Sequence, residues 1–140
     1  MSGYGKYIQS LINKLSLNDK ITFLGTLSEE EMCEQYLRTN VFICPSSIEN
    51  SPNSLGEAQI MRVPHLAASV GGVPDMMKGN EECLYRFEEV EMLAEKICDV
   101  FSVSIDDEKQ QIKTAHIRHS EAINSQTLFD VYNEIRKNIV

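Results

Sequence analysis

The chain has 140 residues, the length of one domain, and its 42% hydrophobic and 24% charged residues are ordinary for a globular protein that folds in water. Its net charge of −8 argues against a nucleic-acid partner, because a protein that binds nucleic acid needs a basic face to neutralise phosphates. No apolar run approaches the roughly 20 residues that cross a bilayer, and no signal peptide opens the chain, so we expect a cytoplasmic protein.

The first part of the chain predicts a helix, a short strand and a second helix. Apolar residues at helical spacing indicate a helix over residues 4–15. The short run Ile21–Leu24 is rich in residues that favour strands and is followed by glycine, as is typical of a strand. Ser28 and Glu31 then have the spacing of a capping box, so we expect a helix to about Leu37.

The middle of the chain alternates between strands and helices. Val41–Cys44 is a continuous apolar run, which suits a parallel strand covered on both faces. A polar loop, Ser46–Asn53, leads into a helix near Ser54–Met61. The next strand is expected at His65–Ser69 and a fourth short strand at Cys83–Phe87, with a helix that starts at a proline between them.

The rest of the chain is predicted to be helical. Apolar residues from Met92 to Phe101 mark one helix, and about Asp106–Asn138 forms a helical tail with a weak break near residues 120–125. Alternating strands and helices build a mainly parallel sheet with helices on both faces. We therefore expect an α/β, Rossmann-like parallel sheet of about four strands with flanking helices and a helical C-terminal tail.

Two segments follow predicted strands, at the edge where open α/β sheets bind ligands. The first, Ser46–Ala58, joins a polar loop to a helix start, where backbone N–H groups attract oxyanions and hydroxyl-rich ligands. It carries Glu49 and Glu57, whose carboxylates can accept hydrogen bonds from neighbouring sugar hydroxyls. Without further pattern, the two acids are more simply explained as a surface loop acid and a first-turn helix acid.

The second segment, Ser69–Asp75, contains paired glycines, Gly71 and Gly72. Glycines let a backbone approach a ligand closely or adopt a positive φ, although a plain strand-to-helix turn also explains them. The four cysteines stand singly, without the close spacing that a zinc site or a redox dithiol needs.

Together the two segments form an ordered series of motifs: Ser46-x-x-Glu49-Asn50-Ser51-Pro52-Asn53-Ser54-Leu55-Gly56-Glu57-Ala58, then Val63-Pro64, then Val70-Gly71-Gly72-Val73-Pro74-Asp75. This series closely resembles the retaining GT-B glycosyltransferases of the group 1 (family 4) type. The resemblance runs from about Asn18 to Phe101 and implies their C-terminal, donor-binding domain.

The resemblance implies roles for individual residues. Glu49 matches the first motif glutamate, the catalytic position at the donor sugar and its phosphate. Glu57 matches the second glutamate, which binds the ribose hydroxyls of the nucleotide. Ser54 and Leu55 fall beside the nucleotide, and Gly71 and Gly72 are candidate loop contacts. The loop whose backbone N–H groups hold the hexose hydroxyls corresponds to Asn50, Ser51, Pro52 and Asn53. No metal and no cofactor are implied besides the nucleotide-sugar donor.

Three positions depart from the family pattern. Arg62 stands where the family has the glycine that closes the preceding helix in a left-handed turn, which should cost about 1 kcal/mol if the turn is kept. Ser69 stands in place of a frequent aspartate, and His65 replaces an aliphatic residue.

Residues 1–140 are therefore expected to form part of the donor-binding domain, with the helical tail from about residue 105. Family members begin this domain with two further strands. The loop between the first of these strands and its helix carries the Arg and Lys residues that neutralise the diphosphate. Residues 1–15 resemble the helix that follows the second of those strands. By the same resemblance, we expect residues 1–140 not to include the N-terminal, acceptor-binding domain. Because catalysis needs charge stabilisation at the leaving group, we expect this chain alone to be inactive.

The missing strands also bear on assembly. In the family they lie between the strands that correspond to Ile21–Leu24 and Val41–Cys44, so Val41–Cys44 is left with an unpaired apolar edge that can pair with another strand. Either Ile21–Leu24 pairs directly with it, which we favour, or a second copy of the chain covers it. The apolar surface that lost helices would have covered favours association, so we expect a homo-oligomer through the exposed sheet edge.

The function that the resemblance implies is transfer of a hexose from a nucleotide sugar, such as UDP-, GDP- or ADP-hexose, to an acceptor with retention. The alternative is a non-catalytic module that binds a nucleotide sugar or another protein. The motifs specify neither the sugar, nor the base, nor the acceptor, and leave open whether the full-length protein lies at a membrane surface.

Overall fold

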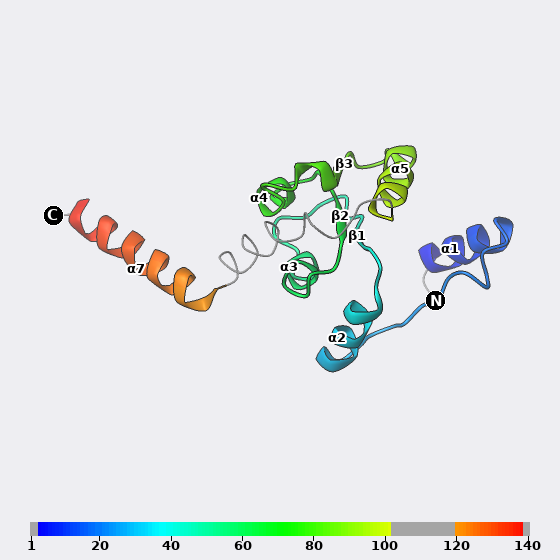
Figure 1. Cartoon of the computed structure of the whole chain (residues 1–140), viewed down its shortest axis with the longest axis horizontal. Helices are drawn as coiled ribbons and strands as arrows, with labels where there is room; N and C mark the ends of the chain where they lie inside the picture. The colour runs from blue at the N-terminus through cyan, green and yellow to red at the C-terminus, as the bar shows by residue number, and fades with distance from the viewer. Residues whose placement is uncertain (1–2, 102–119, 139–140) are drawn as a thin grey trace. The chain divides into compact units, whose positions relative to one another are not determined.

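The computed structural model describes residues 3–101 and 120–138 of the chain (Figure 1). The chain divides into two units, Met1–Met32 and Cys33–Val140. None of the helices in the described ranges is both long and apolar enough to cross a membrane.

The first unit contains the predicted N-terminal helix, α1, over Gly3–Lys14, with Ile12 as its buried residue. The helix closes in a left-handed turn at Ser16, whose φ is 56°. The N–H of Leu17 donates to the carbonyl of Ile12 (2.9 Å) and the N–H of Ser16 to that of Asn13 (3.1 Å), the pattern of a Schellman motif.

The predicted strand at Ile21–Leu24 is wrong, because this segment is irregular and exposed, with 67% of Phe23 accessible to water. A strand is stable only beside a hydrogen-bonded neighbour. The described residues of the first unit contain no strand that could pair with it. The direct pairing expected with the Val41–Cys44 strand is therefore also wrong.

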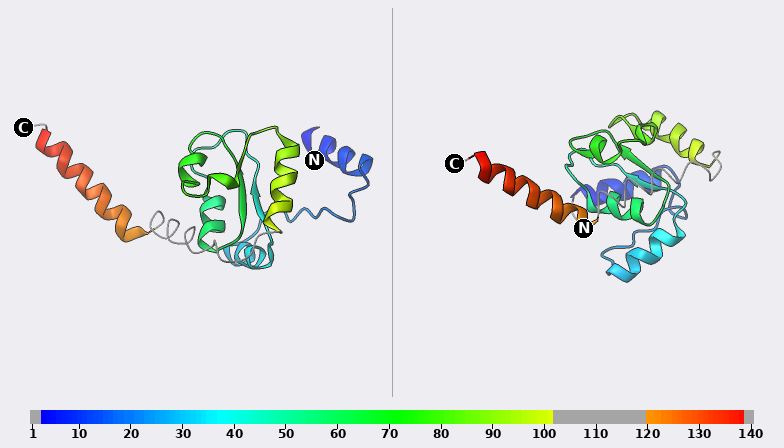
Figure 2. Two further views of the ribbon diagram at one scale, coloured as in Figure 1. Left: turned by 45° about the horizontal axis from the view of Figure 1, so that its top comes forward. Right: turned by 60° about the vertical axis from the view of Figure 1, so that its left-hand side comes forward.

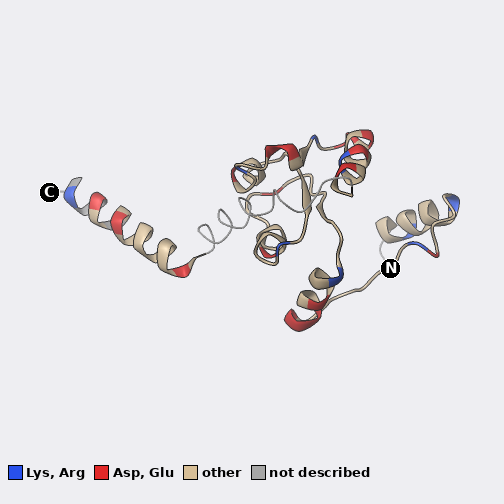
Figure 3. Cartoon of the chain, viewed as in Figure 1, with Lys and Arg blue, Asp and Glu red and all other residues tan. Residues whose placement is uncertain are grey.

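Helix α2, Glu29–Arg38, begins with the predicted capping box. The N–H of Ser28 donates to Oε2 of Glu31 (2.8 Å), and the N–H of Glu31 donates back to Oγ of Ser28 (3.3 Å). The acidic first turn of the helix, which suits the positive end of the helix dipole, is visible in Figure 3 and consists of Glu29, Glu30 and Glu31.

The second unit is built on a parallel sheet of three strands in the order β1-β2-β3, rather than the four expected. Ile43 of β1 lies opposite Leu66 of β2, and Ala67 of β2 lies opposite Leu84 of β3. β2 is the central strand and all four of its residues are buried, as expected for a strand covered on both faces. The strands are β1 Phe42–Cys44, β2 His65–Ala68 and β3 Leu84–Tyr85.

Helices cover both faces of this sheet, so the predicted α/β class is confirmed. Figure 2 shows α3 and α4 on one side and α5 on the other. Leu55, Leu66, Val73 and Met77 are the largest fully buried side chains. The helical elements of this unit after α2 are α3 Asn53–Ile60, α4 Val73–Met76, a 3-10 turn η1 at Glu81–Cys83, α5 Val90–Val100 and α7 Glu121–Asn138.

The helical tail is confirmed over α7, whereas the part of the prediction that falls on residues 102–119 lies outside the described residues.

His65, at the start of β2, is only 4% exposed. Its Nδ1 donates to the carbonyl of Val63 (2.9 Å), while its Nε2 has no hydrogen-bond partner within the described residues. Burial lowers the pKa of His65, against weaker upward effects of that hydrogen bond and of the charge of Glu82. The imidazole of His65 is therefore neutral, and its hydrogen bond to Val63 stabilises the turn that leads into β2.

That turn begins at Arg62, which keeps the left-handed conformation of the family's glycine with a φ of 60°. The N–H of Val63 donates to the carbonyl of Ala58 (2.9 Å) and the N–H of Arg62 to that of Gln59 (3.2 Å), which completes a second Schellman motif. The helix closure is thus kept even though a residue with a β-carbon occupies the turn.

Replacing Arg62 by glycine should raise the free energy of unfolding by about 1 kcal/mol, because glycine removes the steric cost of the left-handed conformation. Urea unfolding followed by circular dichroism would measure the change. Arg62→Ala is the matched control, since it removes the same side chain but keeps the β-carbon. An equal gain in both variants would show that the side chain, and not the backbone conformation, carries the cost.

Candidate functional site

The two candidate segments follow neighbouring parallel strands, as predicted. The loop from Pro45 to Pro52 leads from the carboxyl end of β1 into α3, and Gly71 and Gly72 follow the end of β2. Since β1 and β2 pair in parallel, both segments leave the sheet at the same edge.

The two segments are in direct backbone contact. A β-carbon on Gly71 would lie 1.8 Å from the carbonyl oxygen of Glu49, and one on Gly72 would lie 2.2 Å from the carbonyl oxygen of Asn50. Gly71 also has a φ of +50°, which side chains rarely adopt. The paired glycines therefore let the second segment support the backbone of the first. Contact of either glycine with a ligand remains a prediction.

Glu49 is half-buried in the loop after β1. Its Oε1 accepts a hydrogen bond from Oγ of Ser46 (3.2 Å), and that hydroxyl also lies 3.9 Å from Sγ of the buried Cys44. This contact uses the i, i+3 spacing of the Ser46-x-x-Glu49 motif. It holds one carboxylate oxygen against the end of the strand.

Helix α3 begins at Asn53 without any side-chain cap on its first N–H groups, since Pro52 occupies the N-cap position. Uncapped N–H groups at a helix N-terminus present a partial positive charge to a ligand. The sequence from Thr39 to Met61 contains no lysine or arginine. Within this stretch, the N-terminus of α3 is therefore the source of positive potential.

Glu57 is exposed on α3, and its Oε2 accepts a hydrogen bond from the hydroxyl of Tyr36 (3.0 Å). The same hydroxyl lies 3.1 Å from the carbonyl oxygen of Ser54. The pKa of Tyr36 is raised well above its usual value, first by burial, then by the hydrogen bond to Glu57 and by the charges of Glu57 and Cys33. Tyr36 therefore stays a hydrogen-bond donor throughout the physiological pH range.

Tyr36 was predicted only as part of a helix, without a role in the site. No short-range signal could have found it, because its burial and its acceptors 18 and 21 residues away depend on the fold. The other predicted residues of the site differ in exposure. Leu55 is 0% exposed and packs in the core, and Pro52 is buried, whereas Asn50, Ser51 and Asn53 are exposed and Ser54 is half-buried.

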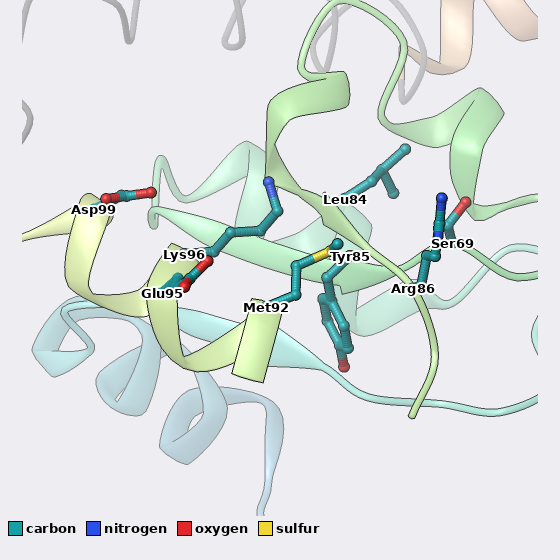
Figure 4. Close-up of a pocket in the computed structure, with 8 residues that line it drawn as sticks. All are labelled: Ser69, Leu84, Tyr85, Arg86, Met92, Glu95, Lys96 and Asp99. Atoms are coloured by element: carbon teal, nitrogen blue, oxygen red, sulfur yellow. The ribbon is translucent and has the colours of Figure 1, made fainter. Parts of the chain in front are cut away.

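A separate pocket of about 460 Å³ lies between β3 and α5 (Figure 4). Arg86 in this pocket pairs with Glu89 (3.1 Å), and Lys96 donates to the carbonyl of Glu82, so both cations are engaged by neighbours. Neither Glu49 nor Glu57 lines this space. Its lining consists of Ser69, Leu84, Tyr85, Arg86, Met92, Glu95, Lys96 and Asp99.

Within the described ranges, no group of three or more His, Cys, Asp or Glu side chains is placed to hold a metal ion. The acids of the candidate site instead hold hydrogen bonds from hydroxyl groups, Glu49 from Ser46 and Glu57 from Tyr36.

An open parallel α/β sheet with polar loops at its carboxyl edge defines a class of proteins that hold a ligand outside the strand ends. Comparison with known families is more specific. Residues 2–118 match the family described as Glycosyl transferases group 1, and the chain belongs to this family.

Two relatives are similar over part of the chain. It is 34% identical over 80 residues to the sulfoquinovosyl transferase of Arabidopsis thaliana, a match that covers 57% of this chain and 16% of that protein. It is also 34% identical over 64 residues to the D-inositol 3-phosphate glycosyltransferase of Mycolicibacterium smegmatis, which covers 46% of this chain and 15% of that protein. The chain thus matches about a sixth of the length of each relative.

Because the two segments are in close contact, a methyl group added at Gly72 should strongly lower stability. Gly72→Ala should lower the free energy of unfolding by about 1–3 kcal/mol, because the β-carbon would overlap the carbonyl of Asn50 and force the loop to move. Denaturant unfolding measures the loss. Gly3→Ala, where a β-carbon meets nothing within 4 Å, should leave stability nearly unchanged. A Gly72→Ala protein as stable as the wild type would contradict the close approach.

Proposed function

We propose that this chain binds the nucleotide-sugar donor of a GT-B glycosyltransferase, which moves a hexose to an acceptor with retention of configuration. The observation that carries the proposal is the arrangement of Glu49 and Glu57 on one loop-and-helix unit at the carboxyl edge of the sheet, supported from behind by Gly71 and Gly72. Membership in the group 1 family supports the transferase chemistry.

In this proposal each part of the unit meets one part of the donor. Glu49 lies at the hexose and its phosphate, and the backbone of Asn50–Asn53 holds the hexose hydroxyls. Glu57 accepts hydrogen bonds from the ribose, beside Ser54. The helix terminus contributes to neutralising the diphosphate without a bound metal. The names of the relatives indicate transfer of a sulfoquinovosyl group by one and action on D-inositol 3-phosphate by the other.

Glu57→Ala should weaken binding of the nucleotide sugar by about ten- to hundredfold, since loss of a carboxylate that accepts from two ribose hydroxyls costs about 1.5–3 kcal/mol. Calorimetric titration with UDP-, GDP- and ADP-hexoses measures the affinity and identifies the base. Glu91→Ala, which removes an exposed acid from the first turn of α5, is the control and should bind as the wild type does. Unchanged affinity in the Glu57→Ala protein would refute the ribose assignment.

We also propose that two copies associate through the free edge of β1, the outer strand of the described sheet. Edge strands with unpaired backbone groups pair readily with another chain, and Ile43 gives this strand an apolar surface. Sedimentation should show a dimer or larger species whose population rises with protein concentration. A clean monomer at high concentration, without binding of a dye for apolar surfaces, would exclude this association.

A further inference from the structure

The side chain of Tyr36 lies between two elements of the second unit. Its ring is only 5% exposed and packs at a tilt against Phe42 of β1, with the ring centres 5.8 Å apart. Its hydroxyl reaches the first turns of α3, 18 residues along the chain at Ser54 and 21 residues at Glu57. The packing fixes the ring, and the ring therefore fixes where the hydroxyl points.

A tyrosine hydroxyl has one proton, which the two acceptors near Tyr36 share. An ionised carboxylate has about four sites that can accept a hydrogen bond. The bond from Tyr36 occupies one site on Oε2 of Glu57 and leaves Oε1 and the remaining site on Oε2 for other donors. An exposed glutamate without such a contact would sample many rotamers, whereas the hydrogen bond from Tyr36 favours one orientation of this carboxylate before any ligand arrives.

We propose that Tyr36 is a positioning residue for nucleotide recognition, which orients the Glu57 carboxylate toward the two hydroxyls of a ribose. The proposal rests on the ribose-binding role proposed for Glu57. Holding the side chain in advance avoids the entropy that its ordering would otherwise cost on binding. It also directs the carboxylate at a pair of hydroxyls, so it strengthens the preference for ribonucleotides over deoxyribonucleotides.

The test compares the wild type with Tyr36→Phe by calorimetric titration with UDP, GDP and ADP and with the deoxyribonucleotide counterpart of each. The variant keeps the ring and loses only the hydroxyl. We expect its affinity for the ribonucleotide to fall about three- to tenfold, the cost of ordering one side chain, with little change for the deoxyribonucleotide. The double variant Tyr36→Phe with Glu57→Ala should bind as Glu57→Ala alone does, because Tyr36 acts through Glu57.

Two controls separate positioning from a structural role. Phe42→Leu loosens the packing of the ring but leaves the hydroxyl, so it should lower the preference for ribonucleotides less than Tyr36→Phe does. A fluorinated tyrosine at position 36 keeps the fold and the hydrogen bond but ionises at lower pH. Its ribonucleotide affinity should fall as pH rises through that ionisation, because a phenolate would repel Glu57. This measurement holds even if Tyr36→Phe folds poorly.

The outcomes are distinguishable. An equal loss of affinity for both nucleotide types, or additive effects in the double variant, would show that Tyr36 supports the fold only. Loss of ribonucleotide preference in Glu57→Ala but not in Tyr36→Phe would refute the positioning role and leave the proposed function standing. If the wild type binds none of these nucleotides, or if Glu57→Ala binds them unchanged, the ribose-binding role of Glu57 falls and the proposal for Tyr36 falls with it.

Discussion

The backbone of Gly71 and Gly72 lies so close to that of Glu49 and Asn50 that no β-carbon fits between them. This contact joins the loops that follow two neighbouring strands. The pairing of the strands in the sheet therefore determines the position of the candidate site. Loop backbones usually move more than the elements they connect. Here the backbone of the loop that carries Glu49 packs against the loop that follows the neighbouring strand. This contact restricts the backbone at Glu49.

Each of the two site carboxylates is also held by a hydroxyl group. Ser46 donates to one oxygen of Glu49, and Tyr36 donates to one oxygen of Glu57. In both cases part of the carboxylate remains able to accept hydrogen bonds, which is what recognition of a hydroxyl-rich ligand requires. The two donors differ in their distance along the chain. Ser46 lies three residues before Glu49 in the same loop, whereas Tyr36 belongs to α2, so the packing of α2 affects where the carboxylate of Glu57 lies.

The sequence predicts best what depends on neighbouring residues. Helical periodicity, the capping box at Ser28 and the apolar run of β1 all use short-range signals, and the motif series also pointed to the left-handed turn at Arg62. The failure at Ile21–Leu24 has the opposite origin, since strand propensity cannot supply the partner that a strand needs. Tyr36 was missed for the same reason, because its acceptors lie 18 and 21 residues away and are brought together only by the fold.

The support of the loop by Gly71 and Gly72 has a consequence for how such a site can change. The glycines lie against the backbone of Glu49 and Asn50 and against Oδ1 of Asn50, so this contact does not depend on the other side chains of the loop. Ile48 is 89% exposed, and Ser47 and Ser51 are exposed beside it. Because these side chains are exposed, substitutions at the three positions would change the surface of the loop while its backbone contact with the glycines stays in place. The loop can therefore vary in sequence with little loss of stability.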